Sequence, residues 1–194
     1  NSLPKKINKL YFGKLEGKFI LNNKSIEEMP IHSRTKEGLG YLPQQRSVFD
    51  MSVYDNILGI AQIAIKEVKD QISMTEKLLD EFNLQHLRNL NASVLSGGEV
   101  KRLMMARVMI NKPKIVLLDE PLAALDPLVI QDIQKYILKI QSSGTAILVT
   151  DHNVKNLFDI TFFKKGSFIS KAIFSGKLYI IMGIWTFLAK LRKN

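Results

Sequence analysis

The sequence Ile115-Val-Leu-Leu-Asp-Glu-Pro121 says most about the fold of this chain. Its four consecutive apolar residues are typical of a strand buried on both faces, as the strands of a parallel sheet are. Two adjacent carboxylates, Asp119 and Glu120, follow at the end of the strand. Ligands of open parallel sheets bind at this end, so one carboxylate is a candidate to hold Mg²⁺ and the other to polarise a water for attack on a phosphoryl group. A strand that simply ends in solvated acids is the alternative interpretation.

The residues after this stretch predict a second parallel strand. Pro127 begins a pattern of apolar residues at helical spacing that ends at Gly144. Residues 146–150 then form a second short apolar run. A strand, a helix and a strand in this order imply a right-handed crossover and a parallel sheet. The sequence therefore predicts an α/β fold with a parallel core sheet.

The residues before it predict a third strand and a mostly helical segment. Residues 38–43 form a short strand that stops at a proline, and residues 32–36 form a short helix. Ser52 can cap a helix, and the spacing of apolar residues predicts that residues 52–93 are mostly helical. Ser96 then opens another helix.

Three further motifs lie at the ends of predicted elements. Residues 96–99, Ser-Gly-Gly-Glu, place two glycines and the free N–H groups of a helix start where a phosphate can bind. His152 follows the second buried strand and can donate to a phosphate oxygen. Gln44 follows the strand at 38–43 and can reach a metal or a water. Each motif also has an ordinary explanation when it is taken singly. Residues 96–99 could be a simple helix cap, and His152 and Gln44 could be loop residues without a function.

Composition and charge narrow the functional classes. The chain has 194 residues, no cysteine and a formal net charge of +10. The absence of cysteine excludes disulfides, zinc knuckles and thiol catalysis. Residues 1–24 carry a net charge of +5 and residues 164–194 carry +7, whereas residues 25–159 carry −2. A nucleic-acid-binding domain would not place its basic residues in this way, so we expect no nucleic-acid partner.

Together, these motifs resemble the nucleotide-binding domain of ABC transporters. Gln44 matches the Q-loop, residues 95–99 the signature motif, and residues 115–120 the Walker B strand with its acidic end. Asp126 matches the D-loop and His152 the H-loop. The resemblance implies a P-loop NTPase fold with a helical subdomain, ATP and Mg²⁺ as ligands, and a dimer that sandwiches ATP.

The resemblance also implies a role for each matched residue. Gln44 and Asp119 would hold Mg²⁺, Glu120 would polarise the attacking water, and His152 would contact the γ-phosphate. Nucleotide contacts from the opposite face of the dimer would come from Ser96, Gly97, Gly98, Glu99 and Asp126.

The resemblance also divides the chain into four parts. Residues 1–45 correspond to the N-terminal β region up to the Q-loop, and residues 46–95 to the helical subdomain. Residues 96–160 correspond to the catalytic core. Residues 161–194 would form a closing hairpin, over 161–173 with its turn at Gly166, and a divergent tail. The apolar run that begins at Leu178 would be an interfacial helix or a decayed tail.

Some motifs are similar to those of the lipopolysaccharide-export ATPases. They are Tyr41-Leu-Pro-Gln44, Ser52-Val-Tyr-Asp-Asn56 and Thr150-Asp-His-Asn-Val154. This similarity implies transmembrane permease partners, with Phe49 in the groove that receives them. It also implies a peripheral location at the cytoplasmic face of the inner membrane. The branched-chain amino-acid importer ATPases are the alternative family.

One motif of the family is absent from the 194 residues, the phosphate-binding loop G-x-x-x-x-G-K-[ST]. We therefore expect the chain to lack the family's first strands and this loop. We also expect it to be poorly stable and to bind ATP weakly or not at all on its own. A non-enzymatic remnant and a nucleic-acid-associated ABC protein are the other interpretations.

Overall fold

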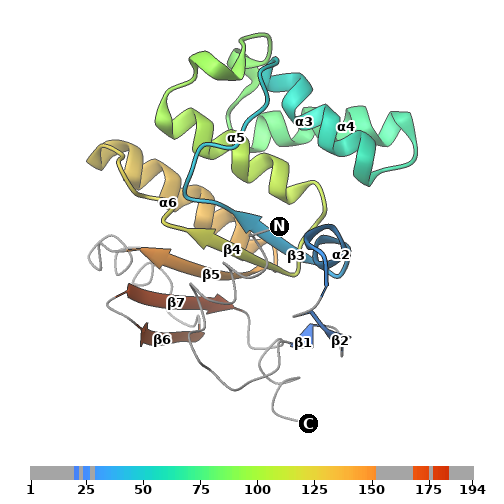
Figure 1. The fold of residues 1–194 in the computed structure, drawn as a ribbon. Helices are drawn as coiled ribbons and strands as arrows, with labels where there is room; N and C mark the ends of the chain where they lie inside the picture. Colours follow the sequence, from blue (N-terminus) through green and yellow to red (C-terminus); the bar gives the residue numbers. More distant parts are fainter. Residues whose placement is uncertain (1–19, 22–23, 27–28, 152–167, 175–176, 184–194) are drawn as a thin grey trace.

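A five-stranded sheet forms the base of the molecule (Figure 1). The computed structural model describes residues 20–21, 24–26, 29–151, 168–174 and 177–183. The strand order in the sheet is β3-β4-β5-β7-β6. The strand bounds are β3 Leu39–Leu42, β4 Ile115–Asp119, β5 Ala146–Asp151, β6 Phe168–Phe174 and β7 Lys177–Gly183.

The three strands that carry the predicted site are parallel. Strand β4 lies between β3 and β5, and both pairings are parallel. All six residues of β5 are buried, as the apolar run predicts. Helix α6, Pro127–Ser142, crosses from β4 to β5 and starts with proline at its first turn. Gly144 follows the helix with a φ of +98°. The predicted strands, crossover and helix end are confirmed.

The other side of the sheet is antiparallel and differs from the prediction. Strand β7 pairs antiparallel with β5, and β6 pairs antiparallel with β7 over seven residues. This pairing lies later in the chain than the hairpin predicted over 161–173, and the turn expected at Gly166 lies outside the described residues. The interfacial helix is wrong for Lys177–Gly183, because these residues complete the sheet as β7. Main-chain pairing with β5 and β6 makes this segment a strand, and a count of its apolar residues does not reveal that pairing.

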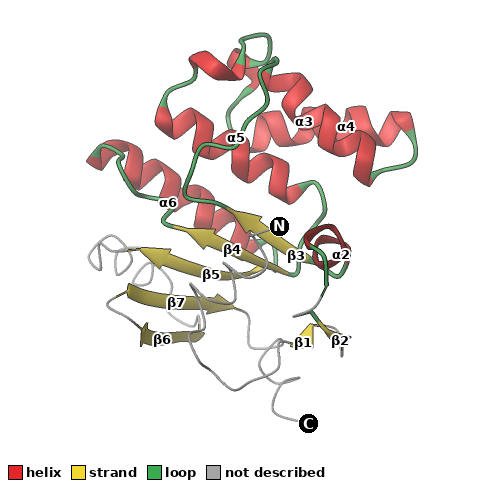
Figure 2. Cartoon of the chain, viewed as in Figure 1, coloured by secondary structure: helices red, strands yellow, loops and turns green. Residues whose placement is uncertain are grey.

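Helices cover the upper face of the parallel strands (Figure 2). Ser52 caps α3, because its side chain accepts a hydrogen bond from the Asp55 backbone N–H at 3.0 Å. The helix bounds are α2 Ile31–Lys36, α3 Val53–Ala64, α4 Val68–Glu81 and α5 Gly97–Met109, with short 3₁₀ turns at Gln85–Leu87 and Ala92–Val94. Two-residue strands β1, Ile20–Leu21, and β2, Lys24–Ser25, pair with each other outside the sheet. The mostly helical character predicted for 52–93 is confirmed.

Helix α5 joins the helical part to the sheet. It contacts α3 and α4 on one side and β3 and α6 on the other. One apolar core runs through these elements, with Ile57 of α3, Leu103 of α5, Leu118 of β4 and Ile137 of α6 almost fully buried. Because the core is continuous and closely packed, a shift of α5 would displace side chains that pack on β3 and β4.

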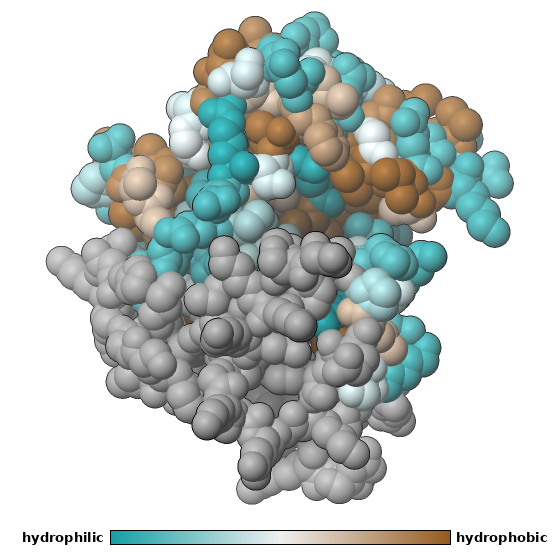
Figure 3. Space-filling model, in the orientation of Figure 1, coloured by the Kyte–Doolittle hydropathy of each residue, from teal (hydrophilic) through white to brown (hydrophobic). Residues whose placement is uncertain are grey.

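Exposed apolar side chains gather on the helical part. Within the part of the chain whose side chains the structure describes, seven of the eight exposed large apolar residues lie between residues 46 and 95. The seven are Phe49, Met51, Ile63, Val68, Ile72, Leu90 and Val94. Figure 3 shows brown, hydrophobic atoms among the hydrophilic ones over this part of the surface. Surface of this kind often marks a contact with another molecule.

Candidate functional site

The site begins where β3 and β4 end side by side. Leu42 pairs with Leu118 in the parallel register, so the residues that follow the two strands meet at one edge of the sheet. There the side-chain amide of Gln44 donates a hydrogen bond of 2.6 Å to Oε2 of Glu120. The fold thus brings together two predicted site residues that are 76 positions apart in the sequence.

Asp119 is held by residues from the two neighbouring strands. Thr150 on β5 donates its hydroxyl to Oδ1 of Asp119 at 3.0 Å, and the hydroxyl of Tyr41 on β3 lies 3.5 Å from Oδ2. Both donors come from strands paired with β4, so strand register fixes the orientation of the carboxylate. Tyr41 and Thr150 lie within the quoted motifs, but the sequence predicts no role for them. The signal that could have identified them is a hydroxyl at the end of an apolar strand.

The backbone of Glu120 turns back sharply after β4. Its φ is +46°, in the left-handed region, which costs a residue with a Cβ about 1–2 kcal/mol. Two hydrogen bonds hold this conformation, from Glu120 N–H to Thr150 O at 2.8 Å and from Ala123 N–H to Glu120 O at 3.2 Å. Only 3% of Glu120 is exposed. A buried acid on strained backbone is a frequent mark of a functional position.

Lys101 on α5 reaches the same edge of the sheet. Its ammonium donates to the backbone carbonyl of Gln44 at 2.9 Å, and only 7% of the residue is exposed. Burial lowers the pKa of Lys101, and the negative charges of Asp119, Asp151 and Glu120 oppose that shift. Lys101 is not among the residues predicted from the sequence. The signal that could have identified it is a lysine among the apolar residues of a helix.

The start of α5 forms a separate, more exposed group. The backbone N–H and the hydroxyl of Ser96 both donate to Oε2 of Glu99, at 2.8 and 2.7 Å. These bonds, chiefly that from the Ser96 side chain, hold the pKa of Glu99 below its ordinary value of 4.5. Ser96 and Gly97 are exposed. The helix start thus satisfies part of its own polar groups and leaves a face open to solvent.

The two glycines of this group allow α5 to approach α6. A Cβ added at Gly98 would lie 2.5 Å from Cγ1 of Val129, and one at Gly97 would lie 3.2 Å from Cδ2 of Leu125. Asp126 begins α6 as its N-cap residue between these two contacts. The structure therefore brings the predicted residues 96–99 close to Asp126. His152 lies outside the described residues.

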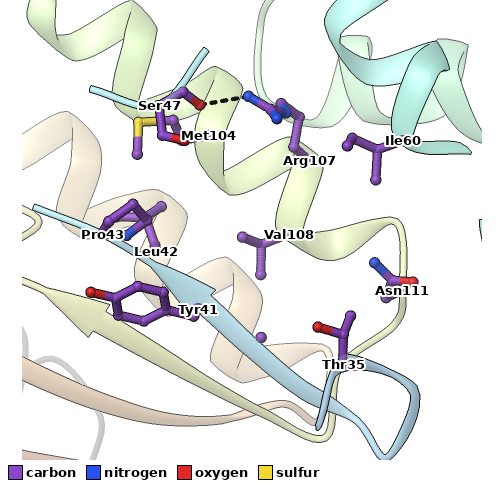
Figure 4. Close-up of a pocket in the computed structure, with 11 residues that line it drawn as sticks. Thr35, Tyr41, Leu42, Pro43, Ser47, Ile60, Met104, Arg107, Val108 and Asn111 are labelled. Carbon is purple, nitrogen blue, oxygen red and sulfur yellow. Dashed lines mark hydrogen bonds between the residues drawn. The ribbon is translucent and has the colours of Figure 1, made fainter. Parts of the chain in front are cut away.

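A cavity lies between β3, α3 and α5, on the helical side of the site (Figure 4). Its volume is about 240 Å³. The lining residues are Thr35, Gly40, Tyr41, Leu42, Pro43, Ser47, Ile60, Met104, Arg107, Val108 and Asn111. Arg107 donates to the Ser47 carbonyl at 2.6 Å, and its guanidinium lies 4.3 Å from the centroid of the Phe49 ring.

Phe49 is held next to this cavity by its backbone. The fully buried Asn56 accepts from the Phe49 N–H at 2.8 Å and donates to the Phe49 carbonyl at 3.0 Å. Phe49 as a whole is 46% exposed. The loop is therefore fixed while the aromatic side chain stays available for contact.

The fold and these motifs define a nucleotide-binding domain of the ABC type. The family model described as ABC transporter matches residues 3–123, and the chain belongs to this family.

Its curated relatives include the lipopolysaccharide export system ATP-binding protein LptB. The chain is 38% identical over 148 residues to LptB of Haemophilus influenzae, covering 75% of this chain and 61% of that protein. It is 40% identical over 146 residues to LptB of Escherichia coli strain K12, covering 72% and 58%. The chain thus spans about three fifths of the length of these relatives.

A solved structure supports the same fold. The ADP conformation of MJ1267, an ATP-binding cassette of an ABC transporter, matches with a TM-score of 0.65 and 25% identity, covering 80% of this chain and 68% of that one. Among the described residues of this chain, no helix has the length and apolarity needed to cross a membrane.

The donor set at the sheet edge suits Mg²⁺. Asp119 offers carboxylate oxygens and Gln44 an amide oxygen, and hard oxygen donors are the ligands that Mg²⁺ prefers. The described residues hold no group of three or more His, Asp or Glu side chains placed to bind a metal. A few protein ligands fit an ion that takes its remaining ligands from water and phosphate.

Proposed function

We propose that this chain is part of the ATP-hydrolysing subunit of an ABC transporter that powers lipopolysaccharide export. The observation that carries the proposal is the cluster of Gln44, Asp119 and Glu120 at the carboxyl edge of the parallel sheet. Membership of the ABC transporter family and 38–40% identity to two LptB proteins support it.

Glu120 has the placement of a general base. The residue is 3% exposed and lies at the sheet edge on left-handed backbone, with its carboxylate bonded to Gln44. In the proposed reaction, a water oxygen attacks the γ-phosphorus of ATP, the bond from that phosphorus to the bridging oxygen breaks, and Glu120 accepts the water proton. The Gln44 amide, which contacts Glu120 in this structure, would orient the same water.

Asp119 and Gln44 are the residues that would hold Mg²⁺. When bound, the ion would neutralise charge on the phosphates. Thr150 and Tyr41 keep the Asp119 carboxylate oriented toward that task. His152 would contact the γ-phosphate, as the family resemblance implies.

The exposed start of α5 supports a dimer, either of this subunit or with a related one. Ser96 and Gly97 are open to solvent at a helix start, where the backbone N–H groups of the first turn have no partner within the helix. In the proposed dimer, residues 96–99 and Asp126 would contact ATP held by the other subunit.

The loop around Phe49 would receive the membrane partners. We propose that transmembrane permease subunits dock at the cavity lined by Arg107, beside Phe49, and hold the protein at the cytoplasmic face of the inner membrane. The concentration of exposed apolar residues between residues 46 and 95 supports a partner on this part.

Replacement of Glu120 by Gln tests the proposed hydrolysis. In a full-length version that carries the G-x-x-x-x-G-K-[ST] loop, Glu120→Gln keeps the shape and removes the base. We expect phosphate release to fall about 10²–10⁴-fold, while ATP binding measured by calorimetry survives. Glu67→Gln, an exposed acid on the helical part, is the matched control and should leave turnover unchanged.

Two results would count against the proposal. Unchanged turnover in Glu120→Gln would remove the role given to this residue. Failure of the full-length parent to bind nucleotide would favour a non-enzymatic remnant. With permease subunits present, stimulation of turnover by lipopolysaccharide supports the export role, and stimulation by branched-chain amino acids supports the importer alternative.

A further inference from the structure

We propose that Lys101 is a positioning residue that links the placement of helix α5 to Gln44 and, through Gln44, to Glu120. The proposal rests on the proposed ATP hydrolysis for its kinetic consequence. Its structural part, the dependence of the Gln44–Glu120 contact on Lys101, stands on the geometry alone.

The link is a short chain of two hydrogen bonds. Lys101 Nζ donates to the Gln44 carbonyl at 2.9 Å, and the Gln44 side-chain amide donates to Glu120 at 2.6 Å. The Lys101 bond fixes the backbone of Gln44, and the Glu120 bond uses its side chain. Because Gln44 lies in an exposed loop, a fixed carbonyl restricts where its side chain can reach.

The position of Lys101 on α5 connects the exposed start of this helix to Gln44. Lys101 lies in the second turn of the helix that begins with Gly97 and Gly98. The same helix start presents the exposed face to which we assign contact with a second subunit. A movement of that face is a movement of α5, and Lys101 carries it to the loop of Gln44, 57 positions away in sequence.

The charge of Lys101 distinguishes it from a packing residue. It is buried, with Val100 and residues 103–106 of the same helix also buried, and an uncharged aliphatic side chain there would avoid the desolvation cost of an ammonium group. Instead the ammonium lies in the field of Asp119, Glu120 and Asp151. A cation among three acids at the sheet edge compensates their charge and keeps Gln44 within reach of them.

The first test measures the contact itself in the nucleotide-free chain. The side-chain amide resonances of Gln44 are assigned by NMR in the parent and in Lys101→Met, Lys101→Gln and Lys101→Arg. We expect Lys101→Met and Lys101→Gln to lose the shift that the carboxylate imposes on the Gln44 amide, and Lys101→Arg to keep it. Lys135→Met, an exposed lysine on α6, should keep it too. If Lys101→Met does not fold, the comparison of Lys101→Gln with Lys101→Arg decides.

The second test measures catalysis in the full-length version. Because Lys101→Met removes the charged donor that fixes the Gln44 backbone, we expect it to lower kcat about tenfold to a hundredfold. KM for ATP should not change, because Lys101 positions the hydrolytic residues and does not contact nucleotide. Lys101→Arg should recover most of kcat, and Lys135→Met should match the parent.

The outcomes separate the two proposals. An unchanged Gln44 resonance in Lys101→Met, or a raised KM with an unchanged kcat, overturns the role of Lys101. A parent protein without any ATP turnover overturns the proposed function, while the NMR comparison still decides whether Lys101 positions Gln44.

Discussion

The carboxyl edge of the sheet and the start of helix α5 hold most of the predicted site, yet they are built in opposite ways. At the sheet edge, polar side chains on or just after β3, β4 and β5 are hydrogen-bonded to one another. Lys101 of α5 donates to the Gln44 backbone carbonyl, and Glu120 and Lys101 are buried. At the start of α5, Ser96 and Glu99 bond to each other and Ser96 remains exposed. The polar groups of the sheet edge find their partners within the chain. Those of the helix start are bonded only to near neighbours, and part of that region is exposed.

This difference predicts which substitutions should reduce the stability of the fold most. Groups in a buried, mutually bonded cluster cannot be replaced one at a time without leaving a partner unsatisfied. Groups at an exposed helix start depend on local geometry, so only a clash there is expensive. The following predictions test the open region, at the start of α5 and on the helical part, by stability, from the largest effect to the smallest.

Gly98→Ala should give the largest loss of stability. The added Cβ would lie 2.5 Å from Cγ1 of Val129, so α5 and α6 must separate or Val129 must shift, at about 1–3 kcal/mol. Urea denaturation measures the loss. Val129→Ala in the same chain should recover most of it.

Gly59→Ala is the matched control for Gly98. An added Cβ at Gly59, inside α3, meets nothing within 4 Å, so the variant should be more stable than the parent by up to about 1 kcal/mol. Equal effects of the two substitutions would show that contact with α6 does not govern Gly98.

Glu99→Gln should have a smaller effect that depends on pH. Because the folded state holds the pKa of Glu99 below 4.5, the charged carboxylate stabilises the fold fully above pH 4.5. This contribution is lost as the pH falls through the lower folded pKa. At pH 7 the parent should be more stable than Glu99→Gln by about 0.3–1 kcal/mol.

Paired denaturation curves at pH 7 and pH 3 measure this change. The gap between parent and variant should narrow at pH 3. A gap that widens in acid would contradict the direction of the pKa shift.

Phe49→Ala should have the smallest effect on stability. Phe49 is 46% exposed and its loop is held through backbone bonds to Asn56, so we expect a loss below about 1 kcal/mol, chiefly the contact with Arg107. Co-purification with permease subunits should nevertheless weaken. Undiminished binding of the permease subunits would show that Phe49 is not part of the docking surface. A large loss of stability would show that its role is structural.

Local patterns predicted most of the fold. The apolar run at 115–118, the cap at Ser52 and the helix stop at Gly144 each depend on neighbouring residues, and the structure has all three as expected. Strand β7 was not predicted, because its apolar residues give no sign of pairing with β5, about 30 residues earlier. Register across a sheet is a long-range property that a single sequence does not display.

The structure brings the predicted residues Gln44, Asp119 and Glu120 to one edge of the sheet, and their catalytic roles stay predictions. The residues that hold them in place were not predicted. Tyr41, Thr150 and Lys101 act through side chains that meet only after β3, β5 and α5 are assembled. The role of a hydroxyl or an ammonium in an apolar segment cannot be inferred until its partner from another element is known.

The left-handed backbone at Glu120 sets stability and chemistry against each other at one position. Glycine is the residue that a φ of +46° favours, and it would relieve the strain at the cost of the carboxylate. A chain selected only for folding would drift toward glycine here, whereas one selected for turnover would keep the acid. The residue at this position therefore reports which of the two pressures a related sequence has been under.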